Sequence, residues 1–366
     1  MFLLYRQRIR CQPFFFYSCR RLLQNGNMKY RLLPETGQKV SEVGFGVWTL
    51  STGWWGEYTE KQALEFLHRA RDLGINFFDT ADVYGDGYGE LLLGKAFGDA
   101  SEEVVIATKV GYDFSGTSRG RGQRELPQDF SEGFLRKAVD DSLRRLRRET
   151  IDNLQLHNIR MEHVEDDALW ALLEALRQEG KIRSYGIALG PAIGWLYEGI
   201  TALRLRRPSV VQHIYNLLEP FPGRPLMDAA PDQNPRFLVR VPHSSGLLEG
   251  KYTAETTFPK GDHRNHRPTH WLPNGLKKVE QLRFLEEPGR TLGQAALQWI
   301  LCEPRILSCL PNIYTMEQLE EFAAAPEAPS LSRVELDRIE QLIAGNFGIE
   351  EPPEAYKGTM ISAASA

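Results

Sequence analysis

The chain has 366 residues, of which 42% are hydrophobic and 25% charged, and these values are ordinary for a globular protein. Its formal net charge of −4 provides no basic field, which argues against a nucleic-acid partner. No apolar run approaches the roughly 18 residues that a membrane span needs, so we expect no membrane insertion. The four cysteines form no CxxC pair, and this favours a reduced, cytoplasmic chain over a disulfide scaffold.

Residues 1–27 differ from the rest of the chain because they carry five arginines and no acidic residue. Such a segment is typical of an organellar transit peptide, which would imply import into an organelle. We favour the alternative that translation starts at Met28, since a strand pattern begins directly after it. The expected organisation is therefore an N-terminal extension at 1–27, one domain at 28–350 and a C-terminal tail at 351–366.

Short apolar runs alternate with amphipathic stretches along the domain. A hairpin is predicted first, at Tyr30–Leu33 and Gln38–Ser41. Eight further strands are predicted at Val43–Trp48, Asn76–Asp79, Val104–Lys109, Asn153–His157, Ile182–Ala188, Ser209–Tyr215, Phe237–Val241 and Ile306–Leu310. Helices are predicted at Glu60–Leu73, Gly89–Phe97, after Ser131, and at Asp166–Gly180, Leu292–Cys302 and Arg333–Ile343.

This alternation predicts a single (β/α)8 TIM barrel with an N-terminal hairpin and a C-terminal helix. A closed parallel sheet covered by helices buries every strand on both faces, which suits strands that read as continuous apolar runs. The rival is a doubly wound Rossmann fold. No GxGxxG follows the first predicted strand, so the barrel is favoured.

Ionisable residues stand at the ends of three successive predicted strands. Asp79 ends the second strand, Lys109 the third and His157 the fourth, and Tyr84 follows Asp79 by five positions. The carboxyl ends of barrel strands open onto the active-site face. Each residue alone would more often be structural, but together they predict an enzyme that uses general acid chemistry.

From Tyr30 to Ala344 the sequence resembles the aldo-keto reductase superfamily. The resemblance rests on the motif at 74–85 around Asp79 and Tyr84, on Lys109 and His157, and on Glu179–Arg183, Gln212 and Gly246–Tyr252. It implies that a small-molecule aldehyde or ketone is reduced by hydride from NADP or NAD, without a Rossmann domain. The potassium-channel β subunits share this fold, so a cofactor-binding regulatory protein is the alternative function.

The resemblance also implies catalytic roles. Tyr84 would protonate the carbonyl oxygen as general acid, and a cationic Lys109 beside it would favour the phenolate that remains. Asp79 would hold Lys109 charged and oriented. His157 would hydrogen-bond the substrate oxygen and fix its position. No metal takes part in this chemistry.

The cofactor side departs from the family pattern. After the fifth strand many members carry a Ser-Asn pair for the nicotinamide carboxamide, where this chain has Ala188 and Leu189, although Gln212 still matches. Tyr314 replaces the cation that meets the 2′-phosphate of NADP, and Gln318 replaces a second one. The choice between NAD and NADP therefore stays open. The expected cofactor contacts are Gln212, Arg240, Ser244, Ser245, Asn312, Thr315 and Gln318, with Arg240 and the two serines facing the pyrophosphate.

Two further clusters, one of tryptophans and one of histidines, could belong to a functional site. Trp48, Trp54 and Trp55 lie on and just after the first predicted strand and are expected to line an apolar substrate pocket, with core packing an equal alternative for Trp48. His263, His266 and His270 have loose metal-like spacing, but they stand in a polar loop that we place away from the catalytic strand ends. We therefore predict no metal site there. The sequence leaves the natural substrate and the oligomeric state open.

Overall fold

The computed structural model describes residues 28–98, 103–116, 126–190 and 195–350; the predicted extension 1–27 and tail 351–366 lie outside these ranges. Eight parallel strands form one sheet in the order β10-β9-β8-β7-β6-β5-β4-β3. A parallel bridge between Val43 and Cys309 joins its first and last strands, so the sheet closes almost completely into a barrel. The predicted fold is therefore confirmed.

The strands are short and follow the predicted apolar runs closely. Their bounds are β3 (Phe45–Gly46), β4 (Phe77–Asp79), β5 (Val105–Val110), β6 (Ile151–His157), β7 (Ile182–Ala188), β8 (Val210–Ile214), β9 (Phe237–Arg240) and β10 (Ile306–Leu310). The first predicted strand is too long, because Val47 already has helical φ and ψ of −72° and −10° and Trp48 begins a helix. Trp48 therefore belongs to α1 and not to a strand.

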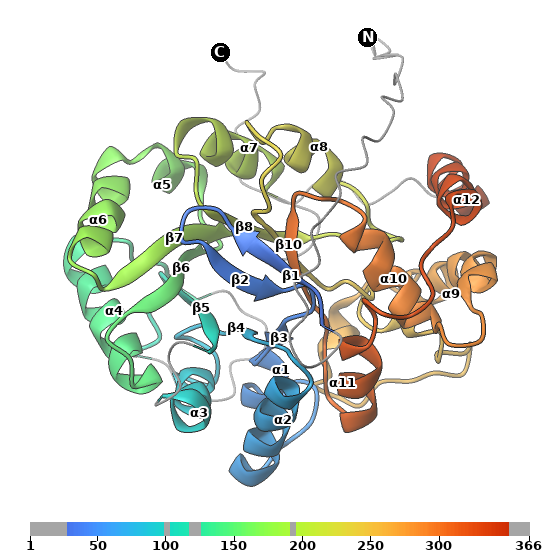
Figure 1. Cartoon of the computed structure of the whole chain (residues 1–366), viewed down its shortest axis with the longest axis horizontal. Helices are drawn as coiled ribbons and strands as arrows, with labels where there is room; N and C mark the ends of the chain where they lie inside the picture. Colours follow the sequence, from blue (N-terminus) through green and yellow to red (C-terminus); the bar gives the residue numbers. More distant parts are fainter. Residues whose placement is uncertain (1–27, 99–102, 117–125, 191–194, 351–366) are drawn as a thin grey trace.

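Helices surround the barrel and connect successive strands (Figure 1). They are α1 (Trp48–Ser51), α2 (Glu60–Asp72), α3 (Tyr88–Phe97), α4 (Glu132–Leu146), α5 (Met161–Glu165), α6 (Asp167–Gln178), α7 (Leu196–Leu205), α8 (Gly223–Asp228), α9 (Trp271–Leu282), α10 (Leu292–Leu301), α11 (Met316–Ala323) and α12 (Arg333–Ala344). Thr59 at the start of α2 and Thr291 at the start of α10 each form a capping box, which satisfies N–H groups that a helix leaves unpaired. These caps fix where the helices begin.

The antiparallel hairpin of β1 (Tyr30–Leu33) and β2 (Gln38–Ser41) covers the amino-terminal end of the barrel, and it crosses the middle of the ring in Figure 1. Leu33 and Val40 from the hairpin are buried with the apolar side chains that fill the barrel interior, among them Phe77, Val105 and Leu238. The hairpin thus closes the barrel at one end. The carboxyl ends of the strands lie at the opposite end, where (β/α)8 enzymes carry their active sites.

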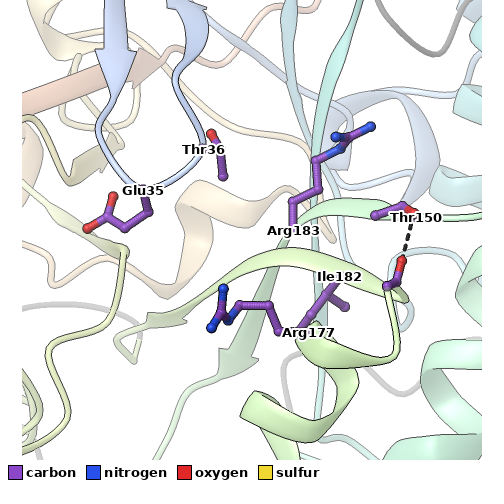
Figure 2. A pocket seen from close by; sticks show the side chains of 7 residues that line it. Glu35, Thr36, Thr150, Arg177, Ile182 and Arg183 are labelled. Carbon is purple, nitrogen blue, oxygen red and sulfur yellow. Dashed lines mark hydrogen bonds between the residues drawn. The ribbon is translucent and has the colours of Figure 1, made fainter.

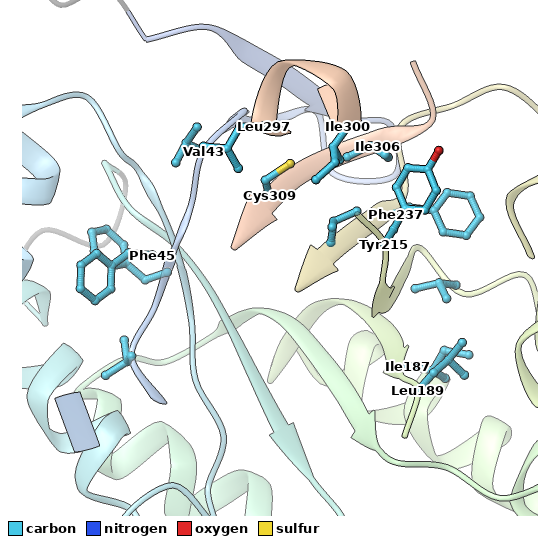
Figure 3. Close-up of a cluster of buried hydrophobic side chains, with 14 of the residues drawn as sticks. Val43, Phe45, Ile187, Leu189, Tyr215, Phe237, Leu297, Ile300, Ile306 and Cys309 are labelled. Carbon is cyan, nitrogen blue, oxygen red and sulfur yellow. The ribbon is translucent and has the colours of Figure 1, made fainter. Parts of the chain in front are cut away.

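A second and larger core lies between the strands and the helices. Figure 3 shows part of it, where Leu297 and Ile300 of α10 pack beside Cys309 and Ile306 of β10. Side chains alternate along each strand, so neighbouring residues face this outer core and the barrel interior in turn. The alternation decides which residues at the strand ends can reach the mouth of the barrel.

Candidate active site

The site is built around a buried ion pair between two neighbouring strands. Lys109 on β5 places its Nζ 2.6 Å from Oδ1 of Asp79, the last residue of β4. The same ammonium donates to the carbonyl oxygen of Thr80 over 2.6 Å. Both charged side chains are almost fully removed from solvent. In such surroundings a charge is tolerated because its partner and its hydrogen bonds are in place.

The second oxygen of Asp79 is also occupied. Gln212 on β8 donates from Nε2 to Oδ2 over 2.8 Å, and Gln155 on β6 donates to the same atom over 3.3 Å. Asp79 therefore accepts hydrogen bonds from three strands besides its own. This arrangement fixes the carboxylate and, through it, the position of Lys109.

Tyr84 and His157 complete the group of four residues that the sequence predicted. The Nζ of Lys109 lies 5.0 Å from the centre of the Tyr84 ring, and the rings of Tyr84 and His157 meet edge to face at 5.8 Å. Tyr112, which follows β5, packs against the other side of His157 at 4.9 Å. The four residues come together at the carboxyl ends of β4, β5 and β6.

His157 is held as a neutral imidazole. Burial, assisted by the charges of Lys109 and Arg240, lowers the pKa of His157 well below its ordinary value of 6.5. Gln128 anchors the end of β6 by donating to the carbonyl oxygen of His157 over 2.9 Å. Within the described residues Nδ1 of His157 is buried without a partner, so it is free to exchange a hydrogen bond with a ligand.

Arg240 ends β9 and lies closer to the catalytic group than the sequence suggested. Its Nη2 donates to the carbonyl oxygens of Leu189 and Gly190, each over 2.6 Å. Tyr84, Asp79 and Tyr112 all interact electrostatically with its guanidinium. The structure therefore places this cation at the barrel mouth, within electrostatic range of Tyr84 and Asp79.

Ser244 and Ser245, predicted at the pyrophosphate, belong to an ionic network. Ser244 donates from Oγ to Glu219 over 3.0 Å, and Arg267 donates to Oγ of Ser245 over 2.9 Å. Arg267 and Glu219 form an ion pair at 2.8 Å that is largely buried. The sequence analysis missed this pair, because 48 positions separate the two residues and no local pattern links them.

The loop after β10 is organised as a helix start. Thr315 accepts from the backbone N–H of Gln318, and the Gln318 side chain accepts from Thr315, which forms a capping box for α11. Gln318 also donates from Nε2 to Oε2 of Glu249 over 2.8 Å. Asn312 is half-buried in the same loop. Burial raises the pKa of Glu249 to about 7, so this carboxyl group titrates near neutral pH.

The three tryptophans form one aromatic cluster beside the mouth. The Trp48 ring lies 5.7 Å from that of Trp54 and 6.2 Å from that of Trp55. His263 packs among them, 4.8 Å from Trp48 and 5.4 Å from Trp54. Trp55 also stacks on Tyr314 at 5.5 Å.

From the sequence we expected the histidine loop to lie away from the strand ends that carry Asp79, Lys109 and His157. In the structure His263 lies against Trp48 and Trp54, which follow the carboxyl end of β3. The loop folds back because stacking on indole rings buries the imidazole face. Across the described ranges, no three His, Cys, Asp or Glu side chains gather into a group that could hold a metal ion.

A polar hollow of about 350 Å³ lies at the hairpin end of the molecule. Figure 2 shows Glu35 and Thr36 of the hairpin turn facing Arg177 and Arg183. Thr150 lies at its edge and donates to the carbonyl oxygen of Gly180 over 2.7 Å. None of the four catalytic candidates lines this hollow, so the active site is assigned from the chemistry at the opposite end.

A parallel (β/α)8 barrel with ionisable side chains at one rim belongs to the class of barrel proteins that work at the carboxyl ends of their strands. Comparison with known proteins narrows the class. The profile of the Aldo/keto reductase family matches residues 42–344, so the chain belongs to the aldo-keto reductase family. The resemblance found in the sequence is thereby confirmed. Membership implies an oxidoreductase that acts on small-molecule carbonyls with a nicotinamide cofactor.

Several relatives cover most of the chain. Aldo-keto reductase YhdN of Bacillus subtilis is 30% identical over 76% of this chain and 82% of its own length. L-glyceraldehyde 3-phosphate reductase of Escherichia coli K12 is 30% identical over 87% of this chain and 93% of its own. Among solved structures, the holo form of aldo-keto reductase AKR11C1 from Bacillus halodurans has a TM-score of 0.68 at 28% identity, and covers 86% of this chain and 96% of that one.

Proposed function

We propose that this protein reduces aldehyde or ketone carbonyls to alcohols with a nicotinamide cofactor, and that Tyr84 is the proton donor. The observation that carries the proposal is the buried Lys109–Asp79 pair, which sets a cation 5.0 Å from the Tyr84 ring. A phenol becomes a useful acid when a nearby cation stabilises its anion. General acid assistance of this kind is worth roughly 10²–10⁴-fold in rate.

The roles of the four side chains follow from their contacts. The bound cofactor supplies the hydride. Tyr84 gives its proton to the carbonyl oxygen, and Lys109 stabilises the resulting phenolate. Asp79 keeps Lys109 protonated and in place, because it accepts directly from Nζ over 2.6 Å. The neutral imidazole of His157 orients the substrate oxygen.

The residues at the mouth fit a nicotinamide ring. Among the described residues, Gln155 Oε1, His157 Nδ1 and Arg240 Nε are buried polar atoms without a partner. Gln212 uses its amide nitrogen on Asp79, so its amide oxygen is the atom left to accept from a carboxamide. We propose that Gln212 contacts the carboxamide, and that Ser244, Ser245, Asn312, Thr315 and Gln318 border the rest of the cofactor.

The distal end of this cofactor region favours NAD over NADP. Glu249 accepts from Gln318, and its charge acts on Tyr314, the residue at the expected phosphate position. Lys251 lies 3.9 Å from Glu249 and 3.6 Å from Glu321, so one exposed cation is shared between two carboxylates. A 2′-phosphate placed here would meet more negative than positive charge.

The test uses the full chain and two cofactors. Tryptophan fluorescence is followed while NADH and NADPH are titrated separately, since Trp48, Trp54 and Trp55 border the mouth. Benzaldehyde is then added to the saturated protein, and the absorbance of the reduced nicotinamide is recorded. We expect binding of both cofactors, tighter for NADH, followed by oxidation. The proposal would be contradicted if neither NADH nor NADPH bound.

Binding without oxidation would favour the regulatory alternative. One relative, a protein of Arabidopsis thaliana described as "Probable voltage-gated potassium channel subunit beta", is 28% identical over 90% of this chain and 100% of its own length. Panels of aliphatic and aromatic aldehydes distinguish a wrong substrate from a true lack of turnover. Turnover of any aldehyde that disappears in Tyr84→Phe supports the reductase.

We further propose a cytoplasmic location and small-molecule carbonyl compounds as the partners of this protein. Within the described ranges no helix is both long and apolar enough to cross a membrane. The net charge of −4 gives no general attraction to nucleic acid. Cell fractionation of the expressed chain tests the location directly.

A further inference from the structure

Arg240 is placed at the mouth by the alternation of side chains along β9. Phe237 and Val239 face the outer core against the helices, whereas Leu238 belongs to the cluster inside the barrel. Arg240 lies two positions after Leu238 and so points inward. It is the last residue of the strand, which puts its guanidinium at the carboxyl end where the catalytic residues gather.

Among the described residues, the guanidinium of Arg240 hydrogen-bonds only to backbone carbonyl oxygens. Nη2 donates to the carbonyl oxygens of Leu189 and Gly190, and Nε has no partner among the described residues. Two buried arginines are paired with carboxylates: Arg148 with Asp152 at 2.9 Å, and Arg236 with Asp232 at 2.8 Å. In the described part of the chain, no carboxylate forms an ion pair with Arg240, which sets it apart from these two.

The local charge is therefore unbalanced. Asp79 is neutralised by Lys109, and the lowered pKa of His157 keeps that ring uncharged. Tyr84, Asp79 and Tyr112 are the groups whose charges act on Arg240, and Asp79 is already paired. One positive charge remains at the mouth. A partly desolvated cation of this kind binds a counter-ion favourably, because the attraction is poorly screened by water.

The backbone after Arg240 is strained and held in place. Val241, Ser244 and Ser245 have φ of 55°, 47° and 56°, a region that side chains rarely adopt and that is especially unfavourable for the β-branched valine. Asn216 donates to the carbonyl oxygen of Val241 over 3.0 Å. Strain of this kind persists where the surroundings fix it, and it concentrates at ligand-binding positions.

We propose that Arg240 binds the carboxylate of the substrate, so that the preferred substrates are carbonyl compounds that also carry a carboxylate. The inference rests on the proposed reductase function. Nε and Nη1 are the donors left after Nη2 has bonded to the backbone, and either of them can donate a charge-assisted hydrogen bond to a carboxylate oxygen. The anchored molecule would present its carbonyl to Tyr84. The diphosphate of the cofactor is the other anion that could bind Arg240. The test distinguishes a substrate carboxylate from this diphosphate.

The kinetic test compares matched substrates. 4-Carboxybenzaldehyde and methyl 4-formylbenzoate share the reacting aldehyde and differ in the charge of the carboxyl group. We expect the wild type to prefer the carboxylate in kcat/KM by about tenfold or more. Arg240→Met should remove most of this preference through KM, and Arg240→Lys should retain part of it. Arg71→Met, an exposed arginine on α2, is the matched control and should keep the preference.

A binding test works without turnover. Benzoate and benzamide are titrated into the wild type and Arg240→Met, and tryptophan fluorescence is followed. Benzoate that binds more tightly than benzamide, only when Arg240 is present, supports the proposal even if no aldehyde is reduced. If benzoate binds in this way but no aldehyde is reduced, the proposed reductase function is contradicted and the carboxylate site is still supported.

Two outcomes overturn the proposal. In the first, the wild type shows no preference for the charged member of either pair. In the second, Arg240→Met leaves the preference intact but weakens NADH and NADPH binding about tenfold or more, which would assign Arg240 to the cofactor diphosphate. Circular dichroism and urea unfolding of the variant ensure that a folding defect is not read as either outcome.

Discussion

Gln212 on β8 donates a hydrogen bond from Nε2 to Oδ2 of Asp79 on β4, across the interior of the barrel and over 2.8 Å. Three strands separate β8 from β4 in the sheet, so the bond ties together parts of the wall that are not neighbours. The sequence assigned Gln212 to the cofactor. Its contact with Asp79 means that the residue we propose for the nicotinamide carboxamide also supports the ion pair of Lys109 and Asp79.

Replacing Tyr84 by Phe removes the phenolic proton while keeping the ring that packs against His157. We expect carbonyl reduction to fall by roughly 10²–10⁴-fold, with cofactor affinity nearly unchanged. Stopped-flow measurement of cofactor oxidation gives the rate of reduction, and a fluorescence titration gives the affinity for the cofactor. Tyr197→Phe, on the exposed face of α7, is the control. Wild-type turnover in the Tyr84 variant would refute the proton-donor assignment.

Lys109→Met should destabilise the fold as well as abolish activity. It leaves Asp79 buried without its cation, which costs about 3–5 kcal/mol in the free energy of unfolding. The double variant Lys109→Met with Asp79→Asn should recover part of that stability and none of the activity. Urea unfolding followed by circular dichroism measures both. Equal stability of the single and double variants would argue against a strongly coupled pair.

Glu249 should make the cofactor preference depend on pH. Burial raises the pKa of Glu249 to about 7, so the carboxyl group becomes charged as the pH rises through that value. The affinity for NADPH should then fall relative to that for NADH between pH 6 and pH 8, by about fivefold for repulsion of roughly 1 kcal/mol. Separate fluorescence titrations of the two cofactors measure the ratio.

Glu249→Gln is the variant that isolates this effect, because the 2′-phosphate itself gains charge near pH 6. The variant should show a flatter pH dependence and a higher relative affinity for NADPH. Glu320 is an exposed carboxylate on α11 that pairs with Arg69 of α2. Glu320→Gln should therefore behave like the wild type. An identical pH dependence in Glu249→Gln would remove Glu249 from the specificity argument.

Buried histidines should make the fold less stable at acid pH. Burial lowers the pKa of His213 to about 3 and that of His243 to about 4, against an ordinary value of 6.5. Below about pH 6.5 the unfolded chain binds protons that the folded chain does not bind. The free energy of unfolding therefore decreases as the pH is lowered, by at most about 1.4 kcal/mol per pH unit and per histidine. For His243 this decrease continues down to about pH 4.

Urea unfolding at pH 7, 6 and 5 measures that slope. His243→Gln should flatten it, since glutamine does not titrate and its amide can replace the contact that the ring nitrogen makes with the Gly293 carbonyl at 3.0 Å. His270→Gln, at an exposed position, should leave the slope unchanged. A slope that is the same in His243→Gln as in the wild type would mean that His243 takes up protons equally in both states.

The order of strands and helices could be read from the sequence, because apolar periodicity and caps are local properties. The same holds for Asp79, Lys109 and His157, since a parallel barrel brings the carboxyl ends of successive strands together whatever the loops do. Trp48 is the exception among the early elements. A helical turn at Val47 ends the strand there, although the residues themselves suit an extended chain.

The loops over the barrel mouth were decided by the tertiary structure. Glu219 meets Arg267, Gln318 meets Glu249, and His263 stacks among tryptophans. Arg240 lies at the mouth, within electrostatic range of Tyr84, because the alternation of β9 and the carbonyl oxygens after β7 hold it there. These contacts join residues far apart in the chain, and they form only once the closed sheet has fixed the distance between its loops. Local sequence determined the barrel and the residues that we propose for catalysis, while the charges that surround them depend on packing across the mouth.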